Sequence, residues 1–225
     1  MVEPASVFAP PDGIWRVGRG DAPHLPRRPA DGTAGDNRFD SQDGTFNVLY
    51  FATTLDGCFG ETLARFRPAP HLRTLLQADW RTNGFMEVGA IPADWRFHRT
   101  AVRVVEAQAP LPFLDIDAVE TLQFLRYELA LGLGSLGVHD LDTSVVRGGD
   151  RRITRLISSW TYNATDPETG ESSYAGIRYA SRLNSQWECW AVFDRVPLLP
   201  LEFIPITPDM PSLRTIAQLF DLRVH

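Results

Sequence analysis

The chain has 225 residues, 44% of them hydrophobic and 22% charged, which is typical of a globular protein with one good core. Its formal net charge of −6 argues against direct nucleic-acid binding, because such binding relies on basic patches that displace counterions. The sequence contains no lysine, which excludes a lysine nucleophile, a Schiff base and a phosphate-loop lysine.

Signals for export and for membrane insertion are missing from the sequence. We find no apolar run of about 18 residues and no basic N-terminus followed by an apolar stretch. Cys58 and Cys189 lie far apart, which favours buried thiols in a reducing compartment over a disulfide framework. The sequence therefore predicts a cytoplasmic protein that does not associate with membranes.

The N-terminal residues 1–37 are rich in Pro, Gly and Asp, and only residues 14–17 resemble a strand. The rest of this segment is expected to be loop. A short apolar run follows at residues 48–52 and predicts a second strand. Thr54 is a plausible N-cap for the helix that comes next.

That helix carries one carboxylate on a nearly bare face. Its apolar residues fall on one stripe at helical spacing: Leu55, Phe59, Leu63 and Phe66. Glu61 lies about 160–200° away from Phe59 and Leu63 at roughly 100° per residue, among Gly57, Gly60 and Ala64. The spacing is compatible with a surface glutamate beside a close helix–strand contact. It is also compatible with a carboxylate at the rim of a ligand slot, facing Arg38 and Tyr50, and the spacing alone does not decide between the two.

Further elements follow from the periodicity of the remaining sequence. Strands are expected at residues 97–105, 111–116, 175–180, 189–193 and 201–206. Helices are expected from residue 119 to near Gly132 or Gly134, over residues 152–162, and from a cap at Ser212 to residue 220. Short strands mixed with separate helices indicate an α+β fold.

The sequence lacks the motifs of several common classes of enzyme and metal site. The five histidines are dispersed without metal-ligand spacing, so no metal is expected. Nucleophile-elbow and phosphate-loop motifs are absent, and the glycine pattern at residues 132–137 follows a helix rather than a strand. Asp115 and Asp117 flank an expected strand end, where acids are also common because a helix begins there.

A second polar stretch closes the strand at residues 177–182, which reads Ile-Arg-Tyr-Ala-Ser-Arg. Hydroxyl and guanidinium groups at one strand end suit the binding of phosphate or ribose. An edge strand with a polar exit explains the same residues equally well.

Together these stretches resemble a RES domain, a family named after its characteristic Arg, Glu and Ser. Those residues would be Arg38 in Asn-Arg-Phe-Asp, Glu61 in the helix, and Ser181 in Tyr-Ala-Ser. The resemblance covers residues 14–194, and we expect a single domain over 1–225 with extensions at both ends. The sequence departs from the commoner pattern at Asn37, where Gly often stands, and at Ala180, where Pro often stands.

The resemblance implies a split β-sheet core flanked by helices, similar to that of ADP-ribosyltransferases, with NAD⁺ as substrate in the cleft. RES proteins are typically toxins of toxin–antitoxin pairs, and their usual partner is an antitoxin with a helix-turn-helix (Xre-type) domain. Family members hydrolyse or phosphorolyse NAD⁺, or transfer ADP-ribose to a protein. A homo-oligomer is also compatible with the resemblance.

The family's chemistry implies a catalytic role for three residues. Cleavage of the nicotinamide–ribose bond passes through an oxocarbenium-like cation, which Glu61 would stabilise. Arg38 would hold the pyrophosphate or an attacking phosphate, and Ser181 would hydrogen-bond the ribose or the nicotinamide amide. Tyr50 would stack on the cationic nicotinamide ring, and Arg178 or Tyr179 would support the phosphates.

Two other functions stay open at this stage. One is an ADP-ribosyltransferase that modifies a cellular protein, and the other is a cleft that binds a nucleotide without turning it over.

Overall fold

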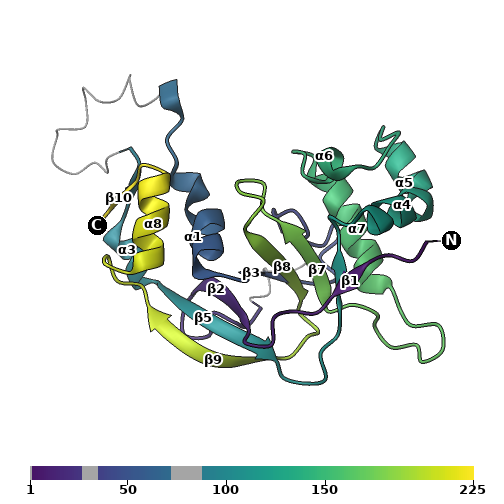
Figure 1. Ribbon diagram of the computed structural model, residues 1–225, viewed down its shortest axis with the longest axis horizontal. Coiled ribbons are helices and arrows are strands. Elements are labelled where there is room, and N and C mark those ends of the chain that lie inside the picture. Colours follow the sequence, from purple (N-terminus) through teal and green to yellow (C-terminus); the bar gives the residue numbers. More distant parts are fainter. Residues whose placement is uncertain (1, 27–34, 72–87) are drawn as a thin grey trace.

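The computed structural model describes residues 2–26, 35–71 and 88–225 (Figure 1). The N-terminal loop expected from the sequence therefore lies partly outside the described residues. The strands are β1 (Ser6–Val7), β2 (Ile14–Arg19), β3 (Val48–Ala52), β4 (Ala90–Ile91), β5 (Arg99–Glu106), β6 (Phe113–Asp115), β7 (Gly176–Ala180), β8 (Glu188–Phe193), β9 (Leu198–Pro205) and β10 (Arg223–Val224). The helices are α1 (Leu55–Leu63), the 3₁₀ turn η1 (Ala64–Phe66), α3 (Ala93–Phe97), α4 (Val119–Glu128), α5 (Ala130–Ser135), α6 (Thr143–Val146), α7 (Arg151–Asn163) and α8 (Pro211–Leu219).

In the part of the chain that the structure describes, eight strands form one mixed sheet in the order β1-β6-β7-β8-β3-β2-β5-β9. Only β6 and β7 pair in parallel within it, and β10 pairs with β4 in a separate two-stranded sheet. Strands β2 and β3 meet through a single residue pair, Trp15 with Ala52, whereas β2 pairs with β5 along its whole length. The sheet is thus split between β2 and β3, and the expectation of an α+β fold with a split sheet is confirmed.

Helices cover the two halves of the sheet separately. Helices α1, α3 and α8 lie near the C-terminus, and α4 to α7 lie at the opposite end of the molecule (Figure 1). The first group encloses a core that includes Phe59, Leu63 and Leu213, all fully buried. The second group covers a core that includes Leu125, Ile157 and other residues packed against β7 and β8. None of the described helices is long and apolar enough to span a membrane.

Helix α1 forms as its sequence predicts. The Thr54 hydroxyl accepts a hydrogen bond from the Gly57 N–H at 3.2 Å, which satisfies one of the unpaired donors of the first turn. Phe59 and Leu63 are buried in the core, while Glu61 on the other side is exposed. The apolar stripe thereby fixes the direction in which the carboxylate points.

The sequence suggested that the glycines of α1 leave space for a ligand, but in the structure one of them makes room for a side chain of the protein itself. A Cβ atom at Gly60 would lie 2.2 Å from the Trp187 ring, so this glycine makes room for a tryptophan. Gly57 closely approaches Ala52 and also lines the pocket described below. A close helix contact therefore explains Gly60, and only Gly57 borders a ligand-sized space.

We expect Gly60→Ala to destabilise the fold by about 1–3 kcal/mol, because the added methyl overpacks against a rigid, buried indole. Gly134→Ala is the matched control, since nothing lies within 4 Å of a Cβ atom at this helical position. Alanine should stabilise that helix by about 0.5–1 kcal/mol. Urea denaturation of both variants measures the difference, and equal stabilities would contradict the proposed contact.

The structure corrects several expected boundaries. Residue 97 ends helix α3 rather than beginning a strand, because Pro92 starts a helical turn that buries Trp95, and β5 begins at Arg99. Helix α8 begins after Met210 with Pro211 in its first turn, so Ser212 is not its cap. The helix from residue 119 is interrupted at Leu129 before it continues as α5. Strands β1, β4 and β10 were not expected, and each contains only two residues, too few for a periodic signal.

Candidate functional site

A pocket of about 620 Å³ opens where β2 and β3 separate, and we refer to it as the Glu61 pocket. Four of the six residues selected from the sequence line it: Arg38, Tyr50, Glu61 and Tyr179. The split of the sheet creates this space, because strands β2 and β3 are joined at only one residue pair. The volume falls in the range usual for small-molecule sites.

Ser181 joins the pocket through its hydrogen bond to Glu61. The Ser181 hydroxyl donates to Glu61 Oε1, and its oxygen accepts the Leu183 N–H at 3.0 Å. Ser181 is almost fully buried at the end of β7, whereas Glu61 is exposed at the pocket wall. A hydrogen bond thus joins Glu61 of α1 to Ser181, which lies 120 positions later in the chain.

Arg38 reaches the pocket with part of its hydrogen-bonding capacity unused. Its Nη2 donates to the Val146 carbonyl at 2.9 Å, and its guanidinium lies 5.2 Å from the centre of the Tyr179 ring. The buried Nε has no hydrogen-bond partner among the described residues. Burial lowers the pKa of Arg38 from its usual value, and the charge of Glu61 opposes that shift. An anionic ligand in the pocket would compensate the buried charge of Arg38.

Helix α7 holds the segment that carries Arg38. The Thr154 hydroxyl donates to the Arg38 carbonyl, and the Ser158 hydroxyl donates to the Phe39 carbonyl at 2.7 Å. Arg155 donates to the Asn37 and Gly35 carbonyls at 3.2 and 2.6 Å. Because Thr154 and Ser158 are fully buried, these bonds fix a segment without regular secondary structure.

Tyr50 is fixed by Asp40, a residue for which no sequence motif indicated a role. The Tyr50 hydroxyl donates to Asp40 Oδ1 at 2.8 Å and accepts the Phe39 N–H at 3.0 Å. The other oxygen of Asp40 accepts both donors of Asn37. Burial and the nearby Asp40 carboxylate raise the pKa of Tyr50 well above its usual value. The hydroxyl is therefore occupied, and only the ring of Tyr50 faces a ligand.

Three more arginines line the Glu61 pocket: Arg16, Arg151 and Arg182. Arg16 is held by the carbonyls of Pro23 and Tyr50 at 2.8 and 2.9 Å. Arg182 belongs to the polar strand end noted in the sequence, but nothing in the sequence indicated Arg151 at the start of α7. Four guanidinium groups around one carboxylate favour an anionic ligand such as a diphosphate, even though the protein has a net charge of −6.

The RES domain family model matches residues 14–212. The chain belongs to the RES-domain family. The match begins at the residue expected from the sequence and extends beyond residue 194 through β9 into α8.

Among solved structures, the crystal structure of the M. tuberculosis MbcT–MbcA toxin–antitoxin complex is similar to this RES chain at 12% sequence identity. The alignment covers 96% of this chain and 90% of that chain, with a TM-score of 0.44. No curated protein sequence matches the RES chain significantly.

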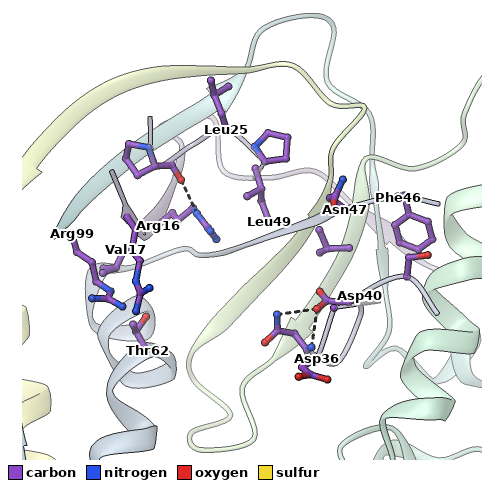
Figure 2. Close-up of a pocket in the computed structure, with 18 of the residues that line it drawn as sticks. Arg16, Val17, Leu25, Asp36, Asp40, Phe46, Asn47, Leu49, Thr62 and Arg99 are labelled. Carbon is purple, nitrogen blue, oxygen red and sulfur yellow. Dashed lines mark hydrogen bonds between the residues drawn. The ribbon is translucent and has the colours of Figure 1, made fainter. Parts of the chain in front are cut away.

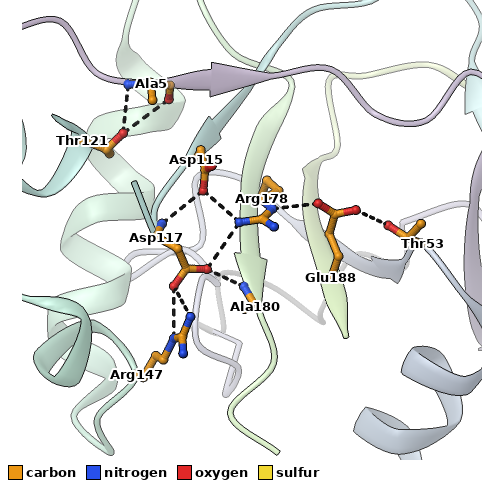
Figure 3. Close-up of polar contacts among 9 residues, drawn as sticks. All are labelled: Ala5, Thr53, Asp115, Asp117, Thr121, Arg147, Arg178, Ala180 and Glu188. Atoms are coloured by element: carbon orange, nitrogen blue, oxygen red, sulfur yellow. Dashed lines mark hydrogen bonds and ion pairs between the residues drawn. The ribbon is translucent and has the colours of Figure 1, made fainter. Parts of the chain in front are cut away.

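Arg178 does not line the Glu61 pocket of this RES domain. Instead it points toward Asp115, Asp117 and Glu188 (Figure 3). Successive residues of β7 face opposite sides of the sheet, so Arg178 and its neighbour Tyr179 cannot both point into the pocket. Arg178 contacts the carboxylates of Asp115, Asp117 and Glu188 at 3.1, 3.7 and 2.9 Å. Its charge is compensated by these acids, so Arg178 is not positioned to contact a ligand in the Glu61 pocket.

Asp117 connects this network with the Glu61 pocket. One carboxylate oxygen accepts two hydrogen bonds from Arg147, and the other accepts the Ala180 N–H (Figure 3). Arg147 follows Val146, whose carbonyl accepts from Arg38, and Ala180 precedes Ser181. Asp117 therefore helps to position Arg38 and Ser181, and the acids at the C-terminal end of β6 have a structural use that the sequence left open.

Both cysteines of the RES domain are buried thiols, as expected. The Cys58 thiol donates to the Trp15 carbonyl at 2.8 Å, and burial raises its pKa to about 12. Burial also raises the pKa of Cys189. No group of three or more His, Cys, Asp or Glu side chains suited to a metal ion occurs within the described ranges.

We expect neither thiol to react with iodoacetamide in the folded protein at pH 8. The thiolate is the reactive form, and at four pH units below a pKa of about 12 only about one thiol in ten thousand is ionised. Mass spectrometry should show two added groups in concentrated urea and none in buffer. Rapid labelling of the folded protein at pH 8 would contradict the burial of these cysteines.

Proposed function

We propose that this RES-domain protein is an NAD⁺-consuming toxin that cleaves the nicotinamide–ribose bond by hydrolysis or phosphorolysis. The observation that carries the proposal is that Arg38 and Glu61 line one pocket and that Ser181, from a third distant segment, donates a hydrogen bond to Glu61. A carboxylate beside several guanidinium groups suits a substrate that combines a cationic glycosidic centre with a diphosphate.

In the proposed reaction, the carbon–nitrogen bond breaks and nicotinamide leaves as a neutral molecule with the bonding electron pair. The ribose becomes an oxocarbenium-like cation, and Glu61 stabilises its positive charge. Water or phosphate then forms the new bond to that carbon, and water releases its extra proton to the solution. The Ser181 hydroxyl donates a hydrogen bond to the Glu61 carboxylate. This bond keeps the negatively charged group oriented toward the ribose.

The remaining pocket residues are proposed to bind the substrate. Arg38 holds the pyrophosphate, because its side chain lines the Glu61 pocket and donates only one hydrogen bond, to the Val146 carbonyl, among the described residues. The ring of Tyr50 stacks on the cationic nicotinamide, while its hydroxyl donates a hydrogen bond to Asp40. Tyr179 lies beneath the Arg38 guanidinium and supports it from the core side. The residues present thus fit NAD⁺ without a contribution from Arg178.

Arg38→Ala is expected to weaken NAD⁺ binding about tenfold or more, which corresponds to the loss of a charged hydrogen bond of about 1.5–3 kcal/mol. Calorimetry with the Glu61→Gln background avoids turnover during the titration. Arg126→Ala serves as the control, because this exposed arginine pairs only with Asp140 among the described residues. An affinity for NAD⁺ equal to that of the control would show that Arg38 does not contact the phosphates.

A second function is favoured by the exposure of Glu61. An exposed catalytic carboxylate can be approached by an acceptor larger than water, so transfer of ADP-ribose to a cellular protein is the alternative. Incubation of the protein and NAD⁺ with a cell extract distinguishes the two. A mass gain of one ADP-ribose on a target protein indicates transfer, whereas soluble ADP-ribose or its phosphate indicates hydrolysis or phosphorolysis.

The toxin role is tested in cells. Induced expression should deplete cellular NAD⁺ and arrest growth, and Glu61→Gln should relieve both effects. We propose a helix-turn-helix (Xre-type) antitoxin as the partner, so co-expression of such a protein from the same operon should restore growth. Continued growth with normal NAD⁺ during expression of the wild-type protein alone would contradict the toxin proposal.

A further inference from the structure

A second cavity of about 700 Å³ adjoins the Glu61 pocket. The two share four wall residues: Arg16, Val17, Asn37 and Thr62. Thr62 and Arg99 lie at one end of the second cavity, and Asp36, Asp40 and Phe46 lie toward the other (Figure 2). We call this space the arginine cavity, after Arg19, Arg65 and Arg99 in its wall.

The three arginines come from β2, η1 and β5, and they gather positive charge at one end of the arginine cavity. Arg99 is nearly buried, stacks 4.6 Å from the centre of the Trp95 ring, and donates one hydrogen bond to the Trp95 carbonyl. Arg99 also lines the arginine cavity, and its guanidinium forms no other hydrogen bond with the described residues. Burial, together with the charges of Arg19 and Arg65, lowers the pKa of Arg99 to about 10, although Asp94 opposes the shift.

Among the described residues, ion pairs do not compensate the charges of Arg65 and Arg99. In the described part of the chain, neither Arg65 nor Arg99 has a carboxylate within ion-pair distance. Asp40 lines the far end of the cavity and is already committed to Tyr50 and Asn37. Bringing like charges together beside a nearly buried guanidinium is unfavourable unless an anion is bound for part of the time.

We propose that the arginine cavity binds a phosphate group with two or more negative charges, at a site separate from the Glu61 pocket. Guanidinium groups match phosphate oxygens in planar, bidentate geometry, and no lysine is present to compete for this role. Free inorganic phosphate or pyrophosphate and the phosphate of a nucleotide share this chemistry. The proposed reaction does not require this site. Anion binding to it can therefore be measured without any turnover of NAD⁺.

The test is calorimetric titration of the full-length protein with inorganic pyrophosphate, orthophosphate and ADP at constant ionic strength. Pyrophosphate should bind the wild-type protein, and Arg65→Gln should weaken that binding about tenfold. Arg65 is exposed, so its replacement should not disturb folding. Arg67→Gln is the matched control, because it removes the same charge two residues later from a side chain that stacks on Phe220 outside the cavity.

Each outcome bears on the proposal. Tighter binding of ADP than of pyrophosphate, with a loss in Arg65→Gln, supports the site and identifies a nucleotide phosphate as its source. Tighter binding of the inorganic anions, with the same loss, supports the site and identifies free phosphate. Equal binding by Arg65→Gln and Arg67→Gln overturns the proposal. A loss in Arg38→Ala without a loss in Arg65→Gln also overturns it, because the anion then lies in the Glu61 pocket.

Discussion

Glu61→Gln is expected to lower NAD⁺ consumption by at least about 100-fold while it leaves folding and NAD⁺ binding nearly unchanged. The substitution keeps the size of the side chain and an oxygen that can accept the Ser181 hydroxyl, but it removes the negative charge. Loss of one group that stabilises developing charge typically costs about 100- to 1,000-fold in rate. The effect should therefore appear in kcat rather than in the affinity for NAD⁺.

Glu120→Gln provides the matched control for this variant. Like Glu61, Glu120 is an exposed glutamate on a helix, but it lies outside the Glu61 pocket. Both variants should unfold at the same urea concentration as the wild-type protein. NAD⁺ turnover in Glu61→Gln at the level of Glu120→Gln would remove Glu61 from the mechanism and would leave the pocket without a catalytic group.

Asp117→Ala is expected to destabilise the protein by about 3 kcal/mol. The change removes two hydrogen bonds from Arg147 and one from the Ala180 N–H, and it leaves Arg178 with one acid fewer. Breaking a buried ion pair costs about 3–5 kcal/mol. We take the lower end, because the Arg147 side chain is about one third exposed to solvent. NAD⁺ turnover should fall as well, since Val146 and Ala180 adjoin the contacts of Arg38 and Ser181.

Asp140→Ala is the control for Asp117→Ala, because Asp140 forms an ion pair with Arg126 in which both side chains are well exposed. Its loss should change the free energy of unfolding by less than about 1 kcal/mol. Urea denaturation followed by tryptophan fluorescence measures both variants. Similar unfolding midpoints for the two would show that the network around Arg178 contributes little to stability.

Local patterns predicted the part of the site that depends on one element and its neighbours. The apolar stripe through Phe59 and Leu63 fixed the orientation of Glu61, and Thr54 capped the helix as its residue type indicated. The Ser181 region was indicated by a polar strand end. In each case the information lies within a few residues, where periodicity and capping rules apply.

Other parts depend on tertiary contacts that periodicity cannot supply. Alternation along β7 predicts that Arg178 and Tyr179 face opposite sides, but only the packed structure shows that Tyr179 faces the pocket. Asp40 became recognisable only through its bond to Tyr50, and Arg151 through the position of α7. Gly60 appeared to leave space for a ligand, whereas the space is filled by Trp187 from a distant turn.

The central claim is that the Glu61 pocket cleaves NAD⁺, and the most direct test is incubation of the purified protein with NAD⁺, with and without inorganic phosphate. Mass spectrometry identifies the products. The account predicts nicotinamide together with ADP-ribose, or with phosphorylated ADP-ribose when phosphate is the acceptor. Intact NAD⁺ in both buffers, with no ADP-ribose on added cellular proteins, would contradict a catalytic role and reduce the pocket to a binding site.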